Sequence, residues 1–151
     1  MVHVSKISVT FTALALLGLG GCVSVPMAPA GQDEIGKSFV TQSGKARIYL
    51  YRDETFGAAI RMPVTFDGKT VGQTASKTYF YWDVEPGQHT LASLTENTPT
   101  LEVITQADNV YYVWQEVKMG AFAARSDLHL VDEIKGKKGV QACKLAQAQA
   151  Y

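Results

Sequence analysis

The sequence predicts an all-β protein, a β-sandwich of about seven strands followed by a short C-terminal helix. Three observations point to this class. Apolar and polar residues alternate with a period of two in several short segments, and turn signals separate these segments at short intervals. The chain has 151 residues, which is enough for one domain with its own core and too few for two ordinary domains. We therefore expect all strands to belong to one sandwich.

The N-terminal segment has the three-part pattern of a secretory signal. Residues 1–6 carry one fixed positive charge, residues 7–19 are apolar except for three hydroxyl residues and one glycine, and Gly20 and Gly21 then precede Cys22. A membrane-spanning helix needs about 20 apolar residues. Because this run is shorter and ends in glycines, we expect a cleaved signal and not a membrane span.

The ending Leu19-Gly20-Gly21-Cys22 resembles the lipobox of bacterial lipoprotein precursors, in which the cysteine thiol receives a diacylglyceryl group before cleavage. The resemblance implies lipidation of Cys22, signal-peptidase cleavage between Gly21 and Cys22, and a signal peptide over residues 1–21. Several acyl chains would make the attachment effectively permanent, since each buried methylene contributes about 0.8 kcal/mol. Val23 at the next position, in place of Asp, implies an outer-membrane location facing the periplasm.

Residues 22–43 are predicted to be the lipidated cysteine and a flexible tether. The segment is rich in Pro, Ala, Gly, Ser and Gln. Four of its residues are expected to interrupt any regular element: Pro26, Pro29, Gly31 and Gly36. The β-sandwich domain would then span residues 44–151, where period-two alternation begins.

The first strand and the first hairpin follow directly. Residues 46–51 place Ala46, Ile48 and Leu50 on one face and Arg47, Tyr49 and Tyr51 on the other, which predicts a half-buried strand. Residues 63–66 and 69–72 flank Asp67-Gly68, and this pair tolerates the positive φ angles of a two-residue hairpin turn.

The remaining elements are predicted from strand formers and turns in the same way. Residues 78–84 end at the turn Glu85-Pro86-Gly87-Gln88, and residues 89–95 return as a strand. Further strands are expected at 101–105, 110–117 and 128–131, the first two forming a pair across Asp108-Asn109. A terminal helix is predicted within residues 140–150, because Gly136 and Gly139 limit how early it can begin.

Four segments carry a resemblance to a known family. They are Lys45 to Arg52, Asp67-Gly68-Lys69, Tyr79 to Leu91 and Val110 to Val113. Together they resemble domain of unknown function family 2846, whose members are bacterial lipoproteins and exported proteins, over about residues 44–134. The resemblance implies the compartment and an immunoglobulin/transthyretin-like sandwich, and it implies no catalytic residues. Residues 84–91 are also similar to surface-layer and PEGA-type β-sandwich modules.

The composition excludes several classes of protein. Lys plus Arg and Asp plus Glu number 14 each, and removal of Lys6 with the signal would leave 13 basic and 14 acidic residues. Such a balance gives no excess charge for binding nucleic acid. Only Cys22 and Cys143 are present, so no disulfide framework is expected once Cys22 carries lipid.

The candidate reactive side chains are His89, His129 and Cys143. Their spacing matches no metal-ligand or nucleophile motif, so we expect no catalytic residues, no metal and no cofactor, and we interpret both histidines as exposed strand residues. Cys143 is expected to be a small buried hydrophobe. An intermolecular disulfide through its thiol is the alternative, because the periplasm is oxidising.

The most distinctive predicted feature is a tyrosine face. Tyr49 and Tyr51 share one face of their strand, and Tyr79 and Tyr81 share the face opposite their apolar neighbours. If the face is exposed, it would suit a peptide, glycan or protein partner. If the terminal helix covers it, the tyrosines form a second core layer, and this is the interpretation we favour.

The sequence therefore predicts a lipid-anchored, non-enzymatic lipoprotein of the cell envelope that serves as an interaction or accessory module, with an envelope protein or glycan as its partner. Two alternatives stay open. One is a β-sandwich subunit of a multi-protein envelope or secretion assembly, comparable in architecture to the lipoprotein of type VI secretion systems. The other is a periplasmic hydrolase, which would need a nucleophile close to a base.

Overall fold

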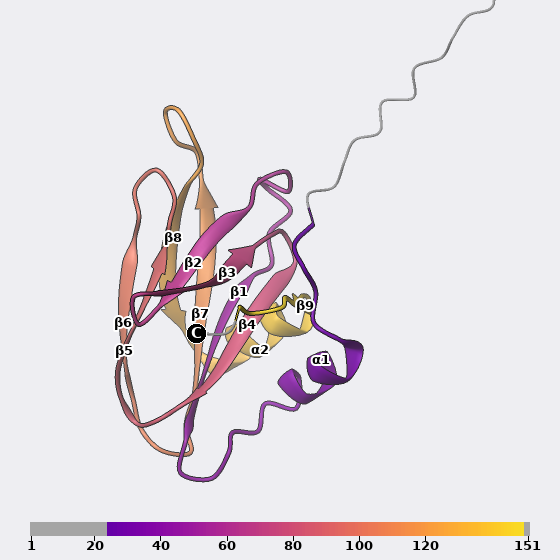
Figure 1. Ribbon diagram of the computed structural model, residues 1–151, viewed down its shortest axis with the longest axis vertical. Coiled ribbons are helices and arrows are strands. Elements are labelled where there is room, and N and C mark those ends of the chain that lie inside the picture. The colour runs from indigo at the N-terminus through magenta and orange to yellow at the C-terminus, as the bar shows by residue number, and fades with distance from the viewer. Residues whose placement is uncertain (1–23, 150–151) are drawn as a thin grey trace, which may run out of the picture.

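Two facing β-sheets and an outer layer of two helices make up the structure, a computed structural model that describes residues 24–149 (Figure 1). The predicted all-β sandwich with a short C-terminal helix is confirmed. The elements are α1 (Ala30–Gly36), β1 (Ala46–Arg52), β2 (Met62–Phe66), β3 (Lys69–Thr74), β4 (Thr78–Val84), β5 (Gly87–Ser93), β6 (Thr100–Thr105), β7 (Val110–Lys118), β8 (Arg125–Val131), α2 (Glu133–Gln141) and β9 (Lys144–Leu145). Neither helix within residues 24–149 has the length and apolar character that crossing a bilayer requires.

The strands divide between a five-stranded and a four-stranded sheet. The first has the order β8-β7-β1-β4-β9 and the second the order β3-β2-β5-β6. The predicted hairpin is confirmed, because β2 and β3 pair antiparallel across Asp67 (φ 48°) and Gly68 (φ 78°). The predicted pairing of residues 101–105 with 110–117 was wrong. The chain does reverse at Asp108, but it crosses between the sheets, so β6 pairs with β5 while β7 pairs with β1 and β8.

Apolar side chains fill the space between the two sheets. Ile48 and Leu50 of β1 and Phe80 and Trp82 of β4 face residues of the opposite sheet such as Phe66, whose ring stacks on Trp82 at a centroid distance of 4.7 Å. The sequence predicted that Ile48 and Leu50 share one face of their strand and that Phe80 and Trp82 lie on the face opposite Tyr79 and Tyr81. The alternation of each strand therefore locates this core.

A second apolar layer covers the outer face of the five-stranded sheet. It contains Tyr49, Tyr51, Tyr79 and Tyr112, packed under α1, α2 and Phe39. Tyr49 and Tyr112 stack with a centroid distance of 5.3 Å. All seven residues of β1 are consequently buried, so the prediction that this strand is half-buried was wrong.

Residues 24–43 pack against the sandwich, and the prediction of a flexible tether was wrong for this stretch. Val25 is buried in the core, the amide of Ala28 donates to the carbonyl of Leu145 (3.0 Å), and α1 follows. Pro29 does not prevent the helix because it lies at the N-cap, where no intrahelical N–H is needed. A Cβ at Gly36 would come within 2.4 Å of the Tyr79 hydroxyl, so glycine permits this close approach.

Helix α2 spans Glu133–Gln141, so the predicted range of 140–150 was wrong beyond its first two residues, and Lys144–Leu145 form β9 instead. The glycines of α2 explain why it begins so early. A Cβ at Gly136 would lie 2.1 Å from Cγ of Tyr112, and a Cβ at Gly139 would lie 2.0 Å from Cε2 of Tyr51. Poor helix formers are thus used where the helix backbone touches the tyrosine layer. Asp132 begins the helix by accepting a hydrogen bond from the amide of Lys135.

We expect Gly139→Ala to lower the free energy of unfolding by about 1–3 kcal/mol, because the added methyl group would overlap the Tyr51 ring. Urea unfolding would measure the change. Gly31→Ala is the matched control, since nothing lies within 4 Å of its Cβ position in α1. That substitution should leave stability unchanged or raise it by about 0.5–1 kcal/mol. Equal effects at the two glycines would contradict the close-approach argument.

Candidate functional site

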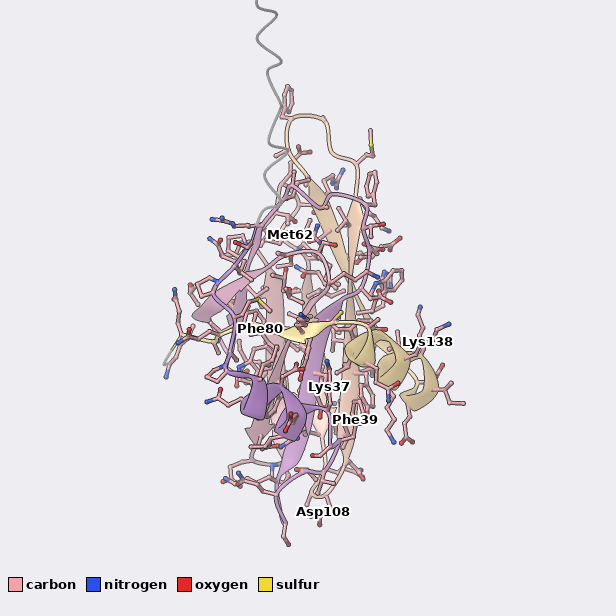
Figure 2. All side chains as sticks on the ribbon, turned by 90° about the vertical axis from the view of Figure 1, so that its right-hand side faces the viewer. Lys37, Phe39, Met62, Phe80, Asp108 and Lys138 are labelled. Atoms are coloured by element: carbon pink, nitrogen blue, oxygen red, sulfur yellow. The ribbon has the colours of Figure 1, made fainter. Side chains whose placement is uncertain are left out.

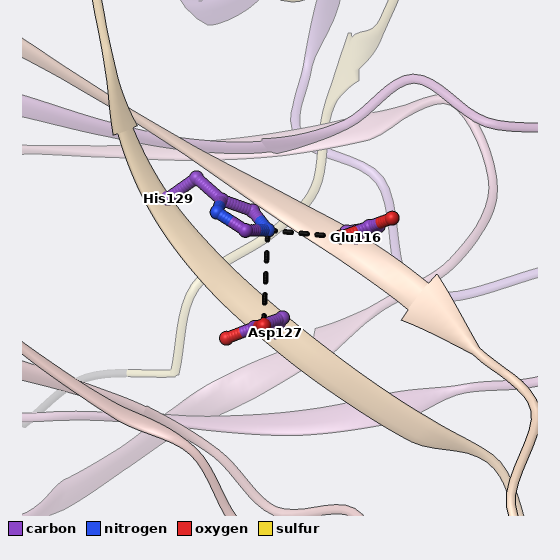
Figure 3. A group of neighbouring side chains, drawn as sticks. All are labelled: Glu116, Asp127 and His129. Carbon is purple, nitrogen blue, oxygen red and sulfur yellow. Dashed lines mark hydrogen bonds and ion pairs between the residues drawn. The ribbon is translucent and has the colours of Figure 1, made fainter.

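The outer face of β7 and β8 carries a group of charged side chains, here called the ion cluster: Glu116, Lys118, Asp127 and His129 (Figure 3). Residues alternate between faces along a strand, and Glu116 pairs across the ladder with Asp127. His129 Nε2 lies 2.9 Å from Oε2 of Glu116 and 4.0 Å from Oδ2 of Asp127. The cluster thus lies on the outer face of the sheet between Trp114 and the C-terminal end of β7.

Helix α2 helps to position the histidine. The imidazole of His129 stacks on the indole of Trp114 at a centroid distance of 5.1 Å, and Lys135 Nζ of α2 lies 4.1 Å from the centroid of the same indole. The His129 ring therefore has a packed face and a hydrogen-bonded edge, which restrict its rotation.

One imidazole and two carboxylates can ligate a divalent transition metal, and their ligand atoms lie within 4.8 Å of one another. Lys118 opposes such binding. Its Nζ lies 3.3 Å from Glu116 and 3.2 Å from Asp127. The hydrogen bond from His129 holds the pKa of Glu116 below its usual value, and the ammonium of Lys118 does the same for Asp127. A metal ion would have to displace a cation that the chain already supplies.

A second distinctive surface is the loop end, defined as the end of the sandwich formed by loops 53–61, 75–77, 94–99 and 119–124. It lies at the top of Figure 1; Met62 lies toward it and Asp108 lies at the opposite end (Figure 2). Four large apolar side chains are exposed here, Phe122 fully, Met119 by 81%, Phe56 by 54% and Leu94 by 40%. The first three line one shallow hollow between loops 53–61 and 119–124.

Charged side chains hold these two loops in place. Arg52, at the end of β1, is fully buried and donates to the carbonyls of Gly57 (2.5 Å) and Ile60 (2.8 Å). Burial without a carboxylate partner at hydrogen-bond distance lowers the pKa of the guanidinium from its usual value. Glu54 accepts from the amide of Val117 (2.8 Å), which links loop 53–61 to β7.

Glu96 fixes the tip of the β7–β8 hairpin. Its carboxylate accepts from the amides of Ala123 (2.8 Å), Phe122 (2.9 Å) and Ala121 (3.3 Å). These three hydrogen bonds lower the pKa of Glu96 below its usual value. The tip is thus shaped by a charge from a neighbouring loop, with the Phe122 side chain directed outward.

The tyrosine face predicted from the sequence exists, but it is covered. Tyr49, Tyr51 and Tyr79 are buried and Tyr81 is half-buried. The Tyr49 hydroxyl donates to the carbonyl of Gly36 (2.5 Å), and the Arg47 guanidinium lies 4.5 Å from the Tyr81 ring centroid. The four tyrosines therefore form a core layer, and the alternative of an exposed partner-binding surface was wrong because α1 and α2 lie over it.

The other sequence candidates lie apart, each with its own partner. His89 Nδ1 is 2.8 Å from Asp67, and its side chain is only 14% exposed, so the expectation of an exposed histidine was wrong for this residue. Cys143 is buried behind α2, as predicted for a small hydrophobe, and burial raises the pKa of its thiol to about 12. Gly21 and the lipidation candidate Cys22 lie outside the described residues.

Sequence reasoning missed a polar network inside the sandwich below the loop end. Gln115 accepts from Thr74 (2.6 Å) and donates to Ser93 (2.6 Å), which in turn accepts from Ser126 (2.7 Å). All four side chains are buried. Their hydroxyls bond to one another and to an amide, with no base at hydrogen-bond distance, so the network joins strands and activates no nucleophile. Its one sequence signal is Gln115 at an inward position between Val113 and Val117.

A groove with a volume of about 670 Å³ lies between β3 and the C-terminal segment. Its lining contains no carboxylate, imidazole or thiol: Pro26, Pro63, Thr70, Gly72, Gln73, Gln147, Ala148 and Gln149. Neither the ion cluster nor the loop end opens into it. The groove therefore offers no acid–base chemistry of its own.

Comparison with known proteins agrees with the resemblance found in the sequence. The family described as "Protein of unknown function (DUF2846)" matches residues 42–127. The chain belongs to the DUF2846 family. A Haemophilus influenzae relative with the printed name "Uncharacterized protein" is 30% identical over 135 residues, 88% of this chain and 80% of the relative. No solved structure matches the chain.

The DUF2846 match extends from before β1 into β8. It includes the whole loop end and three residues of the ion cluster, whereas His129 lies beyond it. Helices α1 and α2, which cover the tyrosine layer, also lie outside the match. The predicted similarity to PEGA-type modules stays a prediction.

We expect Lys118→Ala in this DUF2846 chain to strengthen zinc binding by about tenfold, because removal of the ammonium leaves two carboxylates and an imidazole without their cation. Isothermal titration calorimetry with zinc chloride would measure the affinity. Lys138→Ala, which removes an exposed lysine of α2, is the control and should leave the affinity unchanged. Equal affinities for all three chains would show that Lys118 does not compete with a metal.

We expect Glu96→Gln to loosen the hairpin tip while the sandwich stays folded, lowering the backbone order parameters of residues 121–123 from about 0.85 toward about 0.6. NMR relaxation would measure them. Because the folded state lowers the pKa of Glu96, the restraint is present above the usual pKa and is lost as the pH falls through the folded value. Acidification of the unmutated chain should therefore reproduce the effect, and Glu102→Gln on β6 should not. An ordered tip in Glu96→Gln would count against the restraint.

Proposed function

We propose that this DUF2846 protein is a lipid-anchored lipoprotein of the bacterial cell envelope that acts as a non-enzymatic interaction or accessory module. In this proposal Cys22 carries the lipid after cleavage behind Gly21, and the domain stands on the periplasmic side of the outer membrane, consistent with Val23 after the cysteine.

The position of Cys22 carries the proposal. The cysteine follows an apolar run that ends in two glycines, and it precedes the first described residue, Ser24, by two positions. Val25 is already part of the core. A cleavage in front of Cys22 would therefore leave the lipid almost directly on the folded domain, with no long segment between them.

The arrangement of the reactive side chains supports a non-enzymatic role. A hydrolase needs a nucleophile within hydrogen-bond reach of a base. The Cys143 thiol donates to the carbonyl of Arg52 (3.5 Å), and its raised pKa keeps it protonated near neutral pH. His89 on β5 pairs with Asp67, and His129 on β8 pairs with Glu116; β5 and β8 belong to different sheets. These groups serve packing and ion pairing.

We expect Cys22→Ser to abolish incorporation of an alkyne-tagged palmitate and to leave a larger, uncleaved precursor in bacterial cells, because the acyl groups and the cleavage both depend on this thiol. Click labelling and intact mass would measure the two effects. Cys143→Ser is the matched control, since it removes the other cysteine, and it should be labelled like the unmutated chain. Unchanged labelling of Cys22→Ser would refute the proposed anchor.

A further inference from the structure

Three exposed apolar side chains of the loop end are gathered around one hollow, whereas other exposed apolar residues lie on separate elements. Phe122, Met119 and Phe56 border one hollow. Ile104 on β6 and Ile134 on α2 are also exposed, but they lie on different sheets or layers. A contiguous exposed apolar surface in a folded domain marks a contact with another apolar phase or partner.

The loop end is built to keep this surface exposed. Residues 119–124 have the sequence Met-Gly-Ala-Phe-Ala-Ala, without a charged side chain. The amides that flank Phe122 are occupied by Glu96, and loop 53–61 is held by Arg52. The apolar side chains therefore do not fold back onto the domain. Because the loops are already held in place, a contact at this surface costs less conformational entropy than one that must first order them.

The described chain begins at this same end. Ser24 and Val25 border the turn at residues 75–77, together with Thr78 at the start of β4. Ser76 donates to the carbonyl of Glu54 (2.6 Å), and Lys77 donates to the carbonyl of Asp53. Both acceptors begin loop 53–61. The start of the described chain thus lies beside two of the loops that form the loop end, in the upper half of Figure 1.

This placement limits the distance between the domain and its anchor. Cys22 precedes Ser24 by two residues, and two extended residues span at most about 7 Å. Because Val25 is fixed in the core beside the turn at residues 75–77, an acylated Cys22 holds this part of the loop end close to the lipid headgroups. The opposite end, with Asp108, then points away from the membrane.

We propose that the loop end docks on the lipid bilayer that holds the anchor, with Phe122 and Met119 inserted at the boundary between headgroups and acyl chains. This inference rests on the proposed lipidation of Cys22. The bilayer is favoured over a protein partner because the short connection from Cys22 to Ser24 brings the bilayer to this end of the domain. Residues 119–124 themselves carry only apolar side chains, the kind that insert at this boundary, while Lys118 borders the hollow at its edge. The domain would thus stand upright, with its strands rising from the membrane.

The test uses the full chain, purified from membranes and reconstituted into vesicles of phosphatidylethanolamine and phosphatidylglycerol in a ratio of about 3:1, with or without brominated acyl chains. Bromine quenches an indole only on contact. We expect the emission added by Phe122→Trp to fall about twofold in brominated vesicles, since side chains at this boundary lie about 5–10 Å deep. Ile104→Trp is the matched control: its side chain is 75% exposed at the end of β6 away from the loop end, and its added emission should not change.

The mass of the N-terminal peptide from the same sample reports the acylation of Cys22 separately. Acylated Cys22 without quenching at position 122, or with equal quenching at positions 122 and 104, would leave the anchor intact and overturn the bilayer contact. An unacylated Cys22 would overturn the anchor and this inference with it. Photocrosslinking in whole cells, with benzoylphenylalanine in place of Phe122, gives a further readout. Crosslinks to lipid would support docking on the bilayer. A crosslink to one discrete protein would show that a protein, and not the bilayer, contacts this surface.

Discussion

Burial of both faces of β1 is the constraint on which the rest of the structure depends. Its aliphatic face packs against the four-stranded sheet, and its aromatic face needs a second cover. The segments on either side of the matched family region provide that cover, α1 from before β1 and α2 from after β8. A sandwich of two sheets alone would leave Tyr49 and Tyr51 in water, so the helical layer is a part of the core.

The same strand organises the loop end. Its last residue, Arg52, turns a buried positive charge toward carbonyl groups of the loop that follows, and Glu54 extends the connection to β7. Below these residues, Gln115 joins strands of both sheets through hydroxyl groups. These buried polar interactions lie beneath the loop end, where they fix the loops that carry the exposed apolar side chains.

Period-two patterns and turn residues were sufficient to predict the positions of β1 to β8, the Asp67-Gly68 hairpin and the face shared by the tyrosines, because these features depend on local geometry. The ninth strand, β9, lies in a segment that was predicted to be helical. The partners of each strand were not predictable in the same way. Asp108 reverses the chain whether the next strand joins the same sheet or the opposite one. Likewise, Gly139 weakens a helix in isolation, and only the Tyr51 ring beneath it explains why glycine stands there.

The candidate site was less predictable than the fold for a related reason. Glu116 and His129 are 13 residues apart, and they meet only through the register of β7 and β8. The loop end depends on contacts between loops of different hairpins, such as Glu96 with the tip at Phe122. The order of residues 24–43 was hidden because their composition is that of a linker, while their stability comes from pairing with the C-terminal segment.

That pairing has a mechanical consequence. Met27 bridges Ala146, the amide of Gln147 donates to the carbonyl of Pro26, and β9 is itself paired in parallel with β4. A force that pulls on Ser24 must therefore first separate residues 26–28 from residues 145–147 and then strain the edge of the five-stranded sheet. Residues 145–147 thus hold the N-terminal segment in place, so that their removal would weaken the resistance of this segment to tension.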